Sequence, residues 1–189
     1  MSIPLPSSVM IDAASGGVSP HTGRYQKRLS DLEGFFHDTV AWSDAIRDLG
    51  DPVIYEVIEF RQDGCDLFFG TTTIAPGQVG AEFYMTRGHF HQRRDRGEVY
   101  ATMKGQGILL LETHSGQTEV IAMKEGSVAS IPPDWAHRTI NTGTCPLIFS
   151  WVCSVDAGND YGSIRERGMR KLVIQSDGQM TVIDNPRIG

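Results

Sequence analysis

Three histidines and one glutamate stand at spacings that could build a metal site. His89 and His91 lie in the sequence GHFH, Glu98 follows shortly after, and His137 lies in a later segment. In an extended strand, residues i and i+2 share a face, so His89 and His91 would point the same way. Three imidazoles and one carboxylate suit a first-row divalent metal, with positions open for water or substrate. A lone HxH pair is weak evidence, but the four residues together predict a metal centre.

The sequence also offers groups that could bind an anion. Thr71–Thr73 and Thr86 could donate through hydroxyls, and Gly88 offers an unobstructed backbone N–H. The threonine run is equally typical of an ordinary β-strand, and Tyr55 could be a core aromatic. The nearby arginines, which make the region locally basic, are Arg87, Arg93, Arg94, Arg96 and Arg138. Some of them would form a solvated face, and together they could attract a dianionic substrate.

The composition is that of an ordinary globular protein. The chain has 189 residues, 40% of them hydrophobic, and a net charge of −6, which disfavours nucleic acid or an anionic membrane as a partner. Its three cysteines form no CxxC pair, the N-terminus does not resemble a signal peptide, and the apolar runs fall short of a membrane span. These features predict a cytoplasmic protein with no membrane partner.

Short apolar segments separated by turn residues must position the candidate ligands. The predicted strands are 53–60, 67–74, 98–103, 108–113, 118–123, 128–131 and 146–154, with a final hairpin of 171–175 and 180–183. Their spacing is typical of a β-sandwich or barrel. Short helices are expected from a capping box at Ser30–Glu33, over 42–49 before Gly50, and from Ser163. The sequence therefore predicts a mainly all-β fold, with an N-terminal arm and short helices over 1–50 and a barrel over 51–189.

The two histidine segments resemble the motifs of the cupin superfamily. The second reads Gly126-x5-Pro132-x-Asp134-x2-His137-x3-Asn141, with Asp134 where the common pattern has glycine. The first has six residues between His91 and Glu98, more than general cupins have. This longer gap, together with TRGHFH, RGEVY, IPPDWAHRTIN and DAGNDYG, resembles the cupin-type (archaeal-type) glucose-6-phosphate isomerases over nearly the whole chain.

The resemblance implies a cupin β-barrel or jelly roll that interconverts glucose 6-phosphate and fructose 6-phosphate, a reaction of glycolysis and gluconeogenesis. It further implies a homodimer and one divalent metal ion per chain, Fe²⁺ ahead of Mn²⁺, Ni²⁺, Co²⁺ or Zn²⁺. By position, His89, His91, Glu98 and His137 correspond to the metal ligands of the family. The implied substrate-binding residues are Tyr55, Thr72, Thr86, Gly88, Tyr100, Asn159 and Tyr161. Asn159 stands where related chains have histidine, and an amide cannot carry a positive charge.

Two questions about function stay open at this point. Glu98 is the candidate base for moving a proton between adjacent carbons, but a metal-bound carboxylate is a weak base, and a hydride shift would need no base. Another cupin enzyme, such as a dioxygenase or decarboxylase, would use the same four residues. A non-catalytic sugar-binding cupin is the third reading. It is disfavoured because buried charged groups are costly unless they are paired or used.

Overall fold

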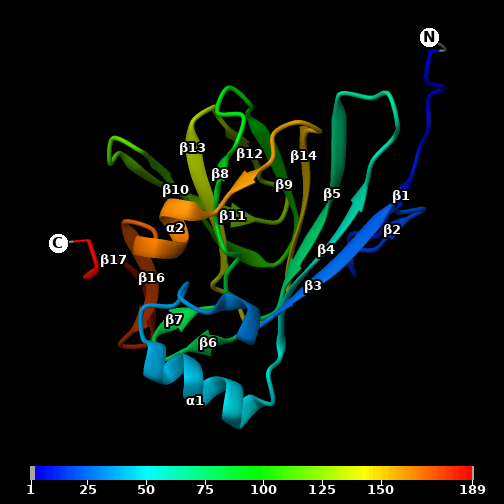
Figure 1. Cartoon of the computed structure of the whole chain (residues 1–189). Coiled ribbons are helices and arrows are strands. Elements are labelled where there is room, and N and C mark those ends of the chain that lie inside the picture. Colours follow the sequence, from blue (N-terminus) through cyan, green and yellow to red (C-terminus); the bar gives the residue numbers. More distant parts are fainter. Residues whose placement is uncertain (1–2, 189) are drawn as a thin grey trace.

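Short antiparallel strands are the main secondary structure in the computed structural model, which describes residues 3–188 (Figure 1). The strands are β1 (Met10–Ile11), β2 (Val18–Ser19), β3 (Gly23–Arg28), β4 (Val53–Phe60), β5 (Leu67–Ile74), β6 (Gln78–Val79), β7 (Glu82–Phe83), β8 (Phe90–His91), β9 (Glu98–Lys104), β10 (Gln106–Thr113), β11 (Thr118–Lys124), β12 (Val128–Ile131), β13 (Trp135–Asn141), β14 (Leu147–Ser154), β15 (Asn159–Asp160), β16 (Lys171–Ser176) and β17 (Gln179–Asp184). The helices are a 3-10 turn, η1 (Ser30–Leu32), α1 (Thr39–Leu49) and α2 (Gly162–Arg167). The predicted all-β class is confirmed.

The largest sheet has six strands in the order β12-β9-β14-β5-β4-β3. Neighbours pair antiparallel, and strands distant in sequence lie side by side: β14 pairs with both β5 and β9. The β-branched and aromatic residues of VIYEVIEF favour a strand, and β4 is buried on both faces, with Ile54 and Tyr55 on opposite sides. This sheet carries Thr72 on β5, Glu98 and Tyr100 on β9, and Tyr55 on β4.

Smaller sheets complete the fold. One has the order β11-β10-β13, another the order β17-β16-β7-β6, and β15 pairs with β8. Strand β10 is buried along nearly its whole length, which explains its apolar run ILLLE. The hydrogen-bonded ladders of the described residues do not close into one continuous barrel, so the expectation of a closed barrel is corrected to an open set of sheets.

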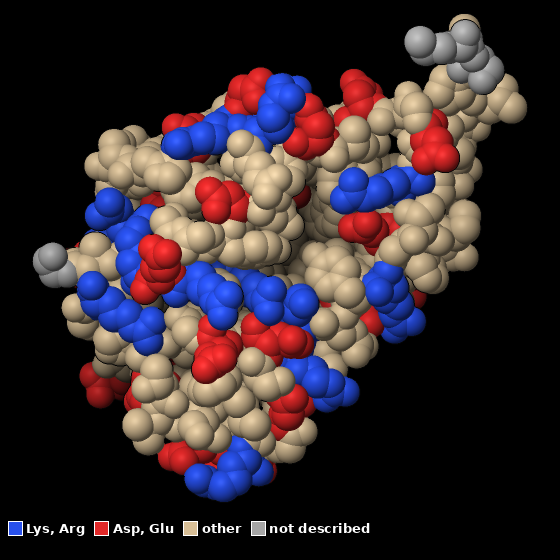
Figure 2. Space-filling model, in the orientation of Figure 1, with Lys and Arg blue, Asp and Glu red and all other residues tan. Residues whose placement is uncertain are grey.

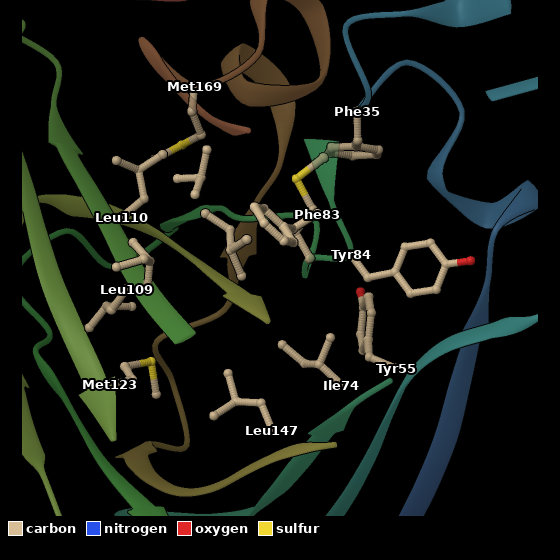
Figure 3. Packing of buried hydrophobic residues seen from close by; sticks show 14 of the residues in the cluster. Phe35, Tyr55, Ile74, Phe83, Tyr84, Leu109, Leu110, Met123, Leu147 and Met169 are labelled. Carbon is tan, nitrogen blue, oxygen red and sulfur yellow. The ribbon is translucent and has the colours of Figure 1, made fainter. Parts of the chain in front are cut away.

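One apolar core connects the sheets to the segments that cover them. Figure 3 shows Leu109 and Leu110 of β10 in the same cluster as Ile74 of β5 and Leu147 of β14, with Phe35 contributed by the loop before α1. These five side chains are at most 5% exposed. The burial of such residues is the main stabilising contribution, at roughly 25 cal/mol per Å² of apolar surface. The strands bearing the candidate ligands thus rest on a rigid, packed base.

The N-terminal part differs from expectation at two places. Residues 23–28, predicted to belong to an arm, form β3, an edge strand paired with β4. The predicted capping box does not form, since η1 has no side-chain cap. Instead Ser30 donates from both its backbone N–H and its hydroxyl to the carboxylate of Asp51, at 2.8 Å each. Hydrogen bonds to a charged carboxylate are stronger than the bond that the Ser30 hydroxyl could form with a backbone amide of a single 3-10 turn.

Helix α1 ends before Gly50 as predicted, but it begins at Thr39, three residues earlier than the predicted start at residue 42. Asp38 caps its N-terminus by accepting a hydrogen bond from the amide of Ala41, and Gly50 ends it in the left-handed conformation with φ of 70°. The last short helix also forms, as α2, although without a side-chain cap. Within residues 3–188, no helix is both long and apolar enough to cross a membrane.

Candidate active site

The metal-ligand candidates lie on or directly beside three strands, β8, β9 and β13. His91 ends β8, and His89 just before it forms a bridge with His137 of β13, with backbone hydrogen bonds in both directions. Glu98 is the first residue of β9. His89 and His91 flank Phe90, whose side chain is buried on the opposite side and stacks on His114 with ring centroids 3.8 Å apart. The predicted sharing of one face by His89 and His91 therefore follows from extended backbone at this point.

The four side chains form one cluster. One ligand atom from each of His89, His91, Glu98 and His137 lies within 4.8 Å of the others. The Oε2 atom of Glu98 is 3.3 Å from Nε2 of His91 and 3.1 Å from Nε2 of His137. The remaining nitrogens are held from behind, because Nδ1 of His91 lies 2.9 Å from the carbonyl of Arg96 and Nδ1 of His137 lies 3.3 Å from that of Trp135. Such contacts orient an imidazole so that Nε2 faces the metal position.

The residues present fit a divalent metal. Nε2 of His137 is fully buried and has no hydrogen-bond partner among the described residues, although it lies beside Glu98. A buried nitrogen of this kind costs free energy unless something binds it. Three imidazoles and one carboxylate are the donors that first-row divalent metals accept. The cluster could therefore hold such an ion.

The ionisation of the cluster suits this role. Burial works to raise the pKa of Glu98, but its contacts with His137 and His91 outweigh burial and lower that pKa to about 2. Burial, together with neighbouring His137, lowers the pKa of His89 well below its usual range. Burial also opposes protonation of His91, but contacts with Cys153 and Glu98 raise its pKa to about 10. An ionised carboxylate and a neutral imidazole are ready ligands, and a metal that binds His91 must displace its proton.

A cavity of about 180 Å³ opens beside the cluster. Figure 2 shows the corresponding hollow between α2 and β3, with basic side chains along part of its rim. All seven substrate-binding residues implied by the sequence line this cavity together with the four-residue cluster: Tyr55, Thr72, Thr86, Gly88, Tyr100, Asn159 and Tyr161. The structure thus brings every candidate residue to one place. Their individual roles stay predictions.

Thr86 and Gly88 present donors to the cavity. The hydroxyl oxygen of Thr86 accepts a hydrogen bond from the backbone N–H of Thr139 at 3.0 Å, which leaves its proton free to donate. Gly88 has a φ of 71°, and a Cβ there would lie 3.0 Å from Cβ of Arg138. Glycine is therefore required at position 88 by both conformation and space.

Asn159 and Tyr161 lie on the segment that follows β14. Strand β15 pairs with β8, and Nδ2 of Asn159 donates to the hydroxyl of Tyr161 at 3.1 Å. The ring of Tyr161 lies 5.5 Å from the ring of His89, measured between centroids. This segment therefore places the two residues at the edge of the four-residue cluster.

The departure at Asp134 has a structural explanation. The residue has a φ of 68°, a conformation that glycine adopts freely and aspartate tolerates better than most. Its carboxylate also forms an ion pair with Arg94. The turn before β13, and hence the position of His137, is kept despite the change from glycine.

The arginines divide into three kinds. Arg93, Arg94 and Arg96 are paired with aspartates at the surface, whereas Arg138 is 1% exposed and donates to the carbonyl of Arg87. Arg138 is therefore not one of the arginines that form the expected solvated face. Only Arg87 of this set lines the cavity.

Some cavity residues escaped the sequence reasoning. Tyr25 and Arg61 line the cavity from β3 and from the end of β4, and Cys153 lines it from β14. Cys153 Sγ lies 3.9 Å from Nε2 of His91. The segment GRYQKR carries no apolar alternation, so nothing in it indicated a strand, and the pairing with β4 is what brings Tyr25 to the site.

The chain matches one family over most of its length. A family model described as "Glucose-6-phosphate isomerase (GPI)" matches residues 26–188. The chain belongs to this family. It is 49% identical over 173 residues to the glucose-6-phosphate isomerase of Thermococcus kodakarensis, covering 90% of each chain, and 46% identical to that of Pyrococcus abyssi, covering 96% of each. The recognition made from the histidine motifs is confirmed.

Bacterial relatives share the family as well. The glucose-6-phosphate isomerase of Sinorhizobium medicae is 40% identical, with 92% of this chain and 82% of the relative aligned. Among solved structures, an oxalate decarboxylase of Lactobacillus farciminis aligns over 56% of this chain and 30% of its own, with 19% identity and a TM-score of 0.47. That overlap is too low to inform the chemistry of this chain.

Proposed function

We propose that the protein interconverts glucose 6-phosphate and fructose 6-phosphate in the cavity beside the four-residue cluster. The observation that carries this proposal is that His89, His91, Glu98 and His137 line the same cavity as all seven implied substrate-binding residues. The relatives named glucose-6-phosphate isomerase, up to 49% identical over most of the chain, support the same reaction.

His89, His91, Glu98 and His137 would hold one divalent ion per chain. We propose Fe²⁺, with Mn²⁺, Ni²⁺, Co²⁺ and Zn²⁺ as alternatives that the same donors accept. When bound, such an ion polarises neighbouring substrate oxygens and stabilises negative charge on them. The protein supplies the geometry, because backbone carbonyls behind His91 and His137 fix both rings.

Glu98 is the proposed group for moving a proton between C1 and C2 of the sugar. Its low pKa keeps the carboxylate ionised at neutral pH, so it is ready to accept a proton but holds it weakly. To act as a base, Glu98 must lose its contact with at least one imidazole. The pKa of Glu98 would then rise. A hydride shift between the two carbons is the alternative in which Glu98 remains only a ligand.

The other cavity residues would bind and orient the sugar phosphate. The free proton of the Thr86 hydroxyl, the hydroxyl of Thr72 and the backbone N–H of Gly88 can donate to phosphate oxygens. Asn159 and Tyr161 reach the cavity from β15 and the residue after it, and Tyr55 and Tyr100 flank it from β4 and β9. A substrate held at its phosphate end would have its carbonyl end at the cluster.

We further propose a cytoplasmic homodimer. Apolar side chains on the outer side of the large sheet support an interface: Val99 of β9 and Val152 of β14 are paired neighbours, 42% and 40% exposed. Light scattering during size-exclusion chromatography tests the oligomeric state. A mass close to the 20.8 kDa of a single chain would overturn it.

A substrate comparison tests the proposed function. The protein loaded with Fe²⁺ or Mn²⁺ is expected to convert fructose 6-phosphate to glucose 6-phosphate without consuming oxygen or releasing carbon dioxide. Oxygen uptake or carbon dioxide release from a carboxylic acid, with no isomerisation, would indicate another cupin enzyme. Binding of fructose 6-phosphate without turnover on metal-loaded protein would indicate a sugar-binding protein instead.

A further inference from the structure

The cavity contains one guanidinium group without a carboxylate partner. Arg87 lines the cavity, and no aspartate or glutamate oxygen among residues 3–188 lies within ion-pair distance of its side chain. Arg61, the other arginine of the cavity wall, is bound to Oε1 of Glu59 at 3.0 Å. The charge of Arg61 is thus compensated, whereas that of Arg87 is available to an anion.

The Arg87 side chain is held by neutral acceptors. Its Nε and Nη2 atoms both donate to the carbonyl of Asp31 in η1, with Nε at 3.2 Å. A carbonyl fixes the orientation of the guanidinium but does not neutralise it. The N–H groups on Nη1 have no partner among the described residues, so donors remain for a ligand.

The Arg87 backbone is fixed from behind. Buried Arg138 donates from Nε and Nη2 to the Arg87 carbonyl at 3.2 and 2.7 Å. On one side of Arg87, Thr86 exchanges backbone and side-chain hydrogen bonds with Thr139; on the other, Gly88 packs against Arg138. Residues 86–88 therefore form a rigid cavity wall, and Arg87 does not need to be ordered when a ligand arrives.

The surroundings of Arg87 are suited to a phosphate group. Its Cζ lies 5.8 Å from the ring centre of Tyr161 and 5.6 Å from that of Phe35. The predicted phosphate donors Thr86 and Gly88 are its chain neighbours, and Asn159 on the same cavity wall is uncharged. A cation beside a dianion offsets part of the cost of removing it from water, and its hydrogen bonds to the anion are stronger than those of neutral donors.

We propose that Arg87 is the cationic group that binds the phosphate of the sugar phosphate. The proposal rests on the proposed function for the identity of the ligand. Charge-assisted hydrogen bonds from a guanidinium to phosphate are among the strongest in proteins, and this one forms in a partly desolvated wall. Arg138 acts through the Arg87 carbonyl and is a positioning residue.

Inorganic phosphate provides a direct probe of this assignment. The experiment compares the metal-loaded wild type with Arg87→Gln and Arg87→Lys, measuring phosphate inhibition, direct phosphate binding by calorimetry, and KM and kcat for fructose 6-phosphate. Removing the charge of Arg87 is expected to raise both the phosphate inhibition constant and the KM by about 10- to 100-fold. This is the loss of affinity that corresponds to one hydrogen bond to a charged group. The lysine variant should recover part of both, and bound metal should stay unchanged.

A matched control separates this role from general loss of positive charge. Arg94→Gln removes an arginine that is paired with Asp134 outside the cavity wall, and its phosphate inhibition is expected to equal that of the wild type. Arg61→Gln removes the compensated cavity arginine and should raise the inhibition constant less than Arg87→Gln does. Wild-type phosphate binding in Arg87→Gln, or a larger loss in Arg61→Gln, would overturn the assignment. Failure of the proposed isomerase function shows separately, because calorimetry measures phosphate binding without turnover.

Discussion

His91 lies directly opposite Asn159 in the antiparallel pairing of β8 with β15. A candidate metal ligand and a candidate substrate residue are thus neighbours in one ladder. Arg96 adds a second connection. Its carbonyl contacts Nδ1 of His91, and its guanidinium binds the carboxylate of Asp156. The six residues between His91 and Glu98 therefore link the cluster of candidate metal ligands to the segment carrying Asn159 and Tyr161.

Asp156→Asn should loosen this link. Asp156 accepts from Arg96 at 2.9 Å through both carboxylate oxygens, and from Arg93 at 3.1 Å. Because the group is exposed, we expect a modest effect: KM for fructose 6-phosphate rises by less than about fivefold, more at low salt than at high salt. Steady-state kinetics at two ionic strengths checks this. Asp134→Asn is the control, because it breaks a separate ion pair with Arg94, which lies between His91 and Glu98 as Arg96 does. An equal change in KM in both variants would argue against the link.

His137→Ala should abolish metal binding while the fold remains. The ring is buried at the cluster, and its loss removes one of four donors and leaves space beside Glu98. Metal content measured on purified protein should fall from about one ion per chain to near zero, and activity should fall with it. The circular dichroism spectrum should stay that of a β protein. Full metal content in this variant would mean that the cluster is not the site.

Glu98→Gln separates the two roles of Glu98. If the carboxylate moves the substrate proton, kcat should fall by about 10²- to 10⁴-fold, the usual contribution of a general base. Metal affinity should fall much less, since an amide oxygen can still coordinate. The comparison requires kcat at saturating metal together with a metal titration. Losses of equal size in both measurements would leave Glu98 as a ligand only and would favour a hydride shift.

The stability of the protein should depend on pH through Glu82. Burial raises the pKa of this carboxyl above its ordinary value of 4.5, although a hydrogen bond from the His37 amide and the charge of Arg138 oppose the rise. The folded state therefore binds the proton more tightly than the unfolded state. Stability is highest below the unfolded pKa and declines as pH rises through the folded pKa.

Glu82→Gln removes this titration. The difference in melting temperature between Glu82→Gln and the wild type should move in favour of the variant as pH rises from about 4 to 7. Thermal unfolding of metal-free samples across that range measures the difference, and contributions from all other groups cancel in it. A difference that is constant with pH would contradict a raised pKa at Glu82.

The sequence predicted several strands well because their apolar residues and the turn residues between them mark where each strand begins and ends. Residues 53–60, 67–74 and 128–131 form strands with the predicted bounds, and the final hairpin extends the prediction by one residue at each loop end. The four-residue cluster was also predictable, since three histidines and one glutamate at those spacings have few other uses together. The other residues of the cavity wall were predicted from the family resemblance and not from the chemistry of their side chains.

What the sequence could not predict depends on pairing in three dimensions. Strand β3 is polar along its length and is recognisable only by its ladder with β4, so Tyr25 was missed. Arg138 has the sequence character of a surface residue but is buried behind residue 87. Ser30 could have capped a helix, and it was the distant Asp51 that bound it instead.

Metal titration of chelator-treated protein tests the central claim most directly. Activity in converting fructose 6-phosphate to glucose 6-phosphate should be absent after chelation and should rise linearly with added Fe²⁺ or Mn²⁺. It should reach a plateau at one ion per chain, as four donors around one position require. Full isomerase activity in protein shown to be metal-free would contradict the claim, as would no activity at one bound ion per chain.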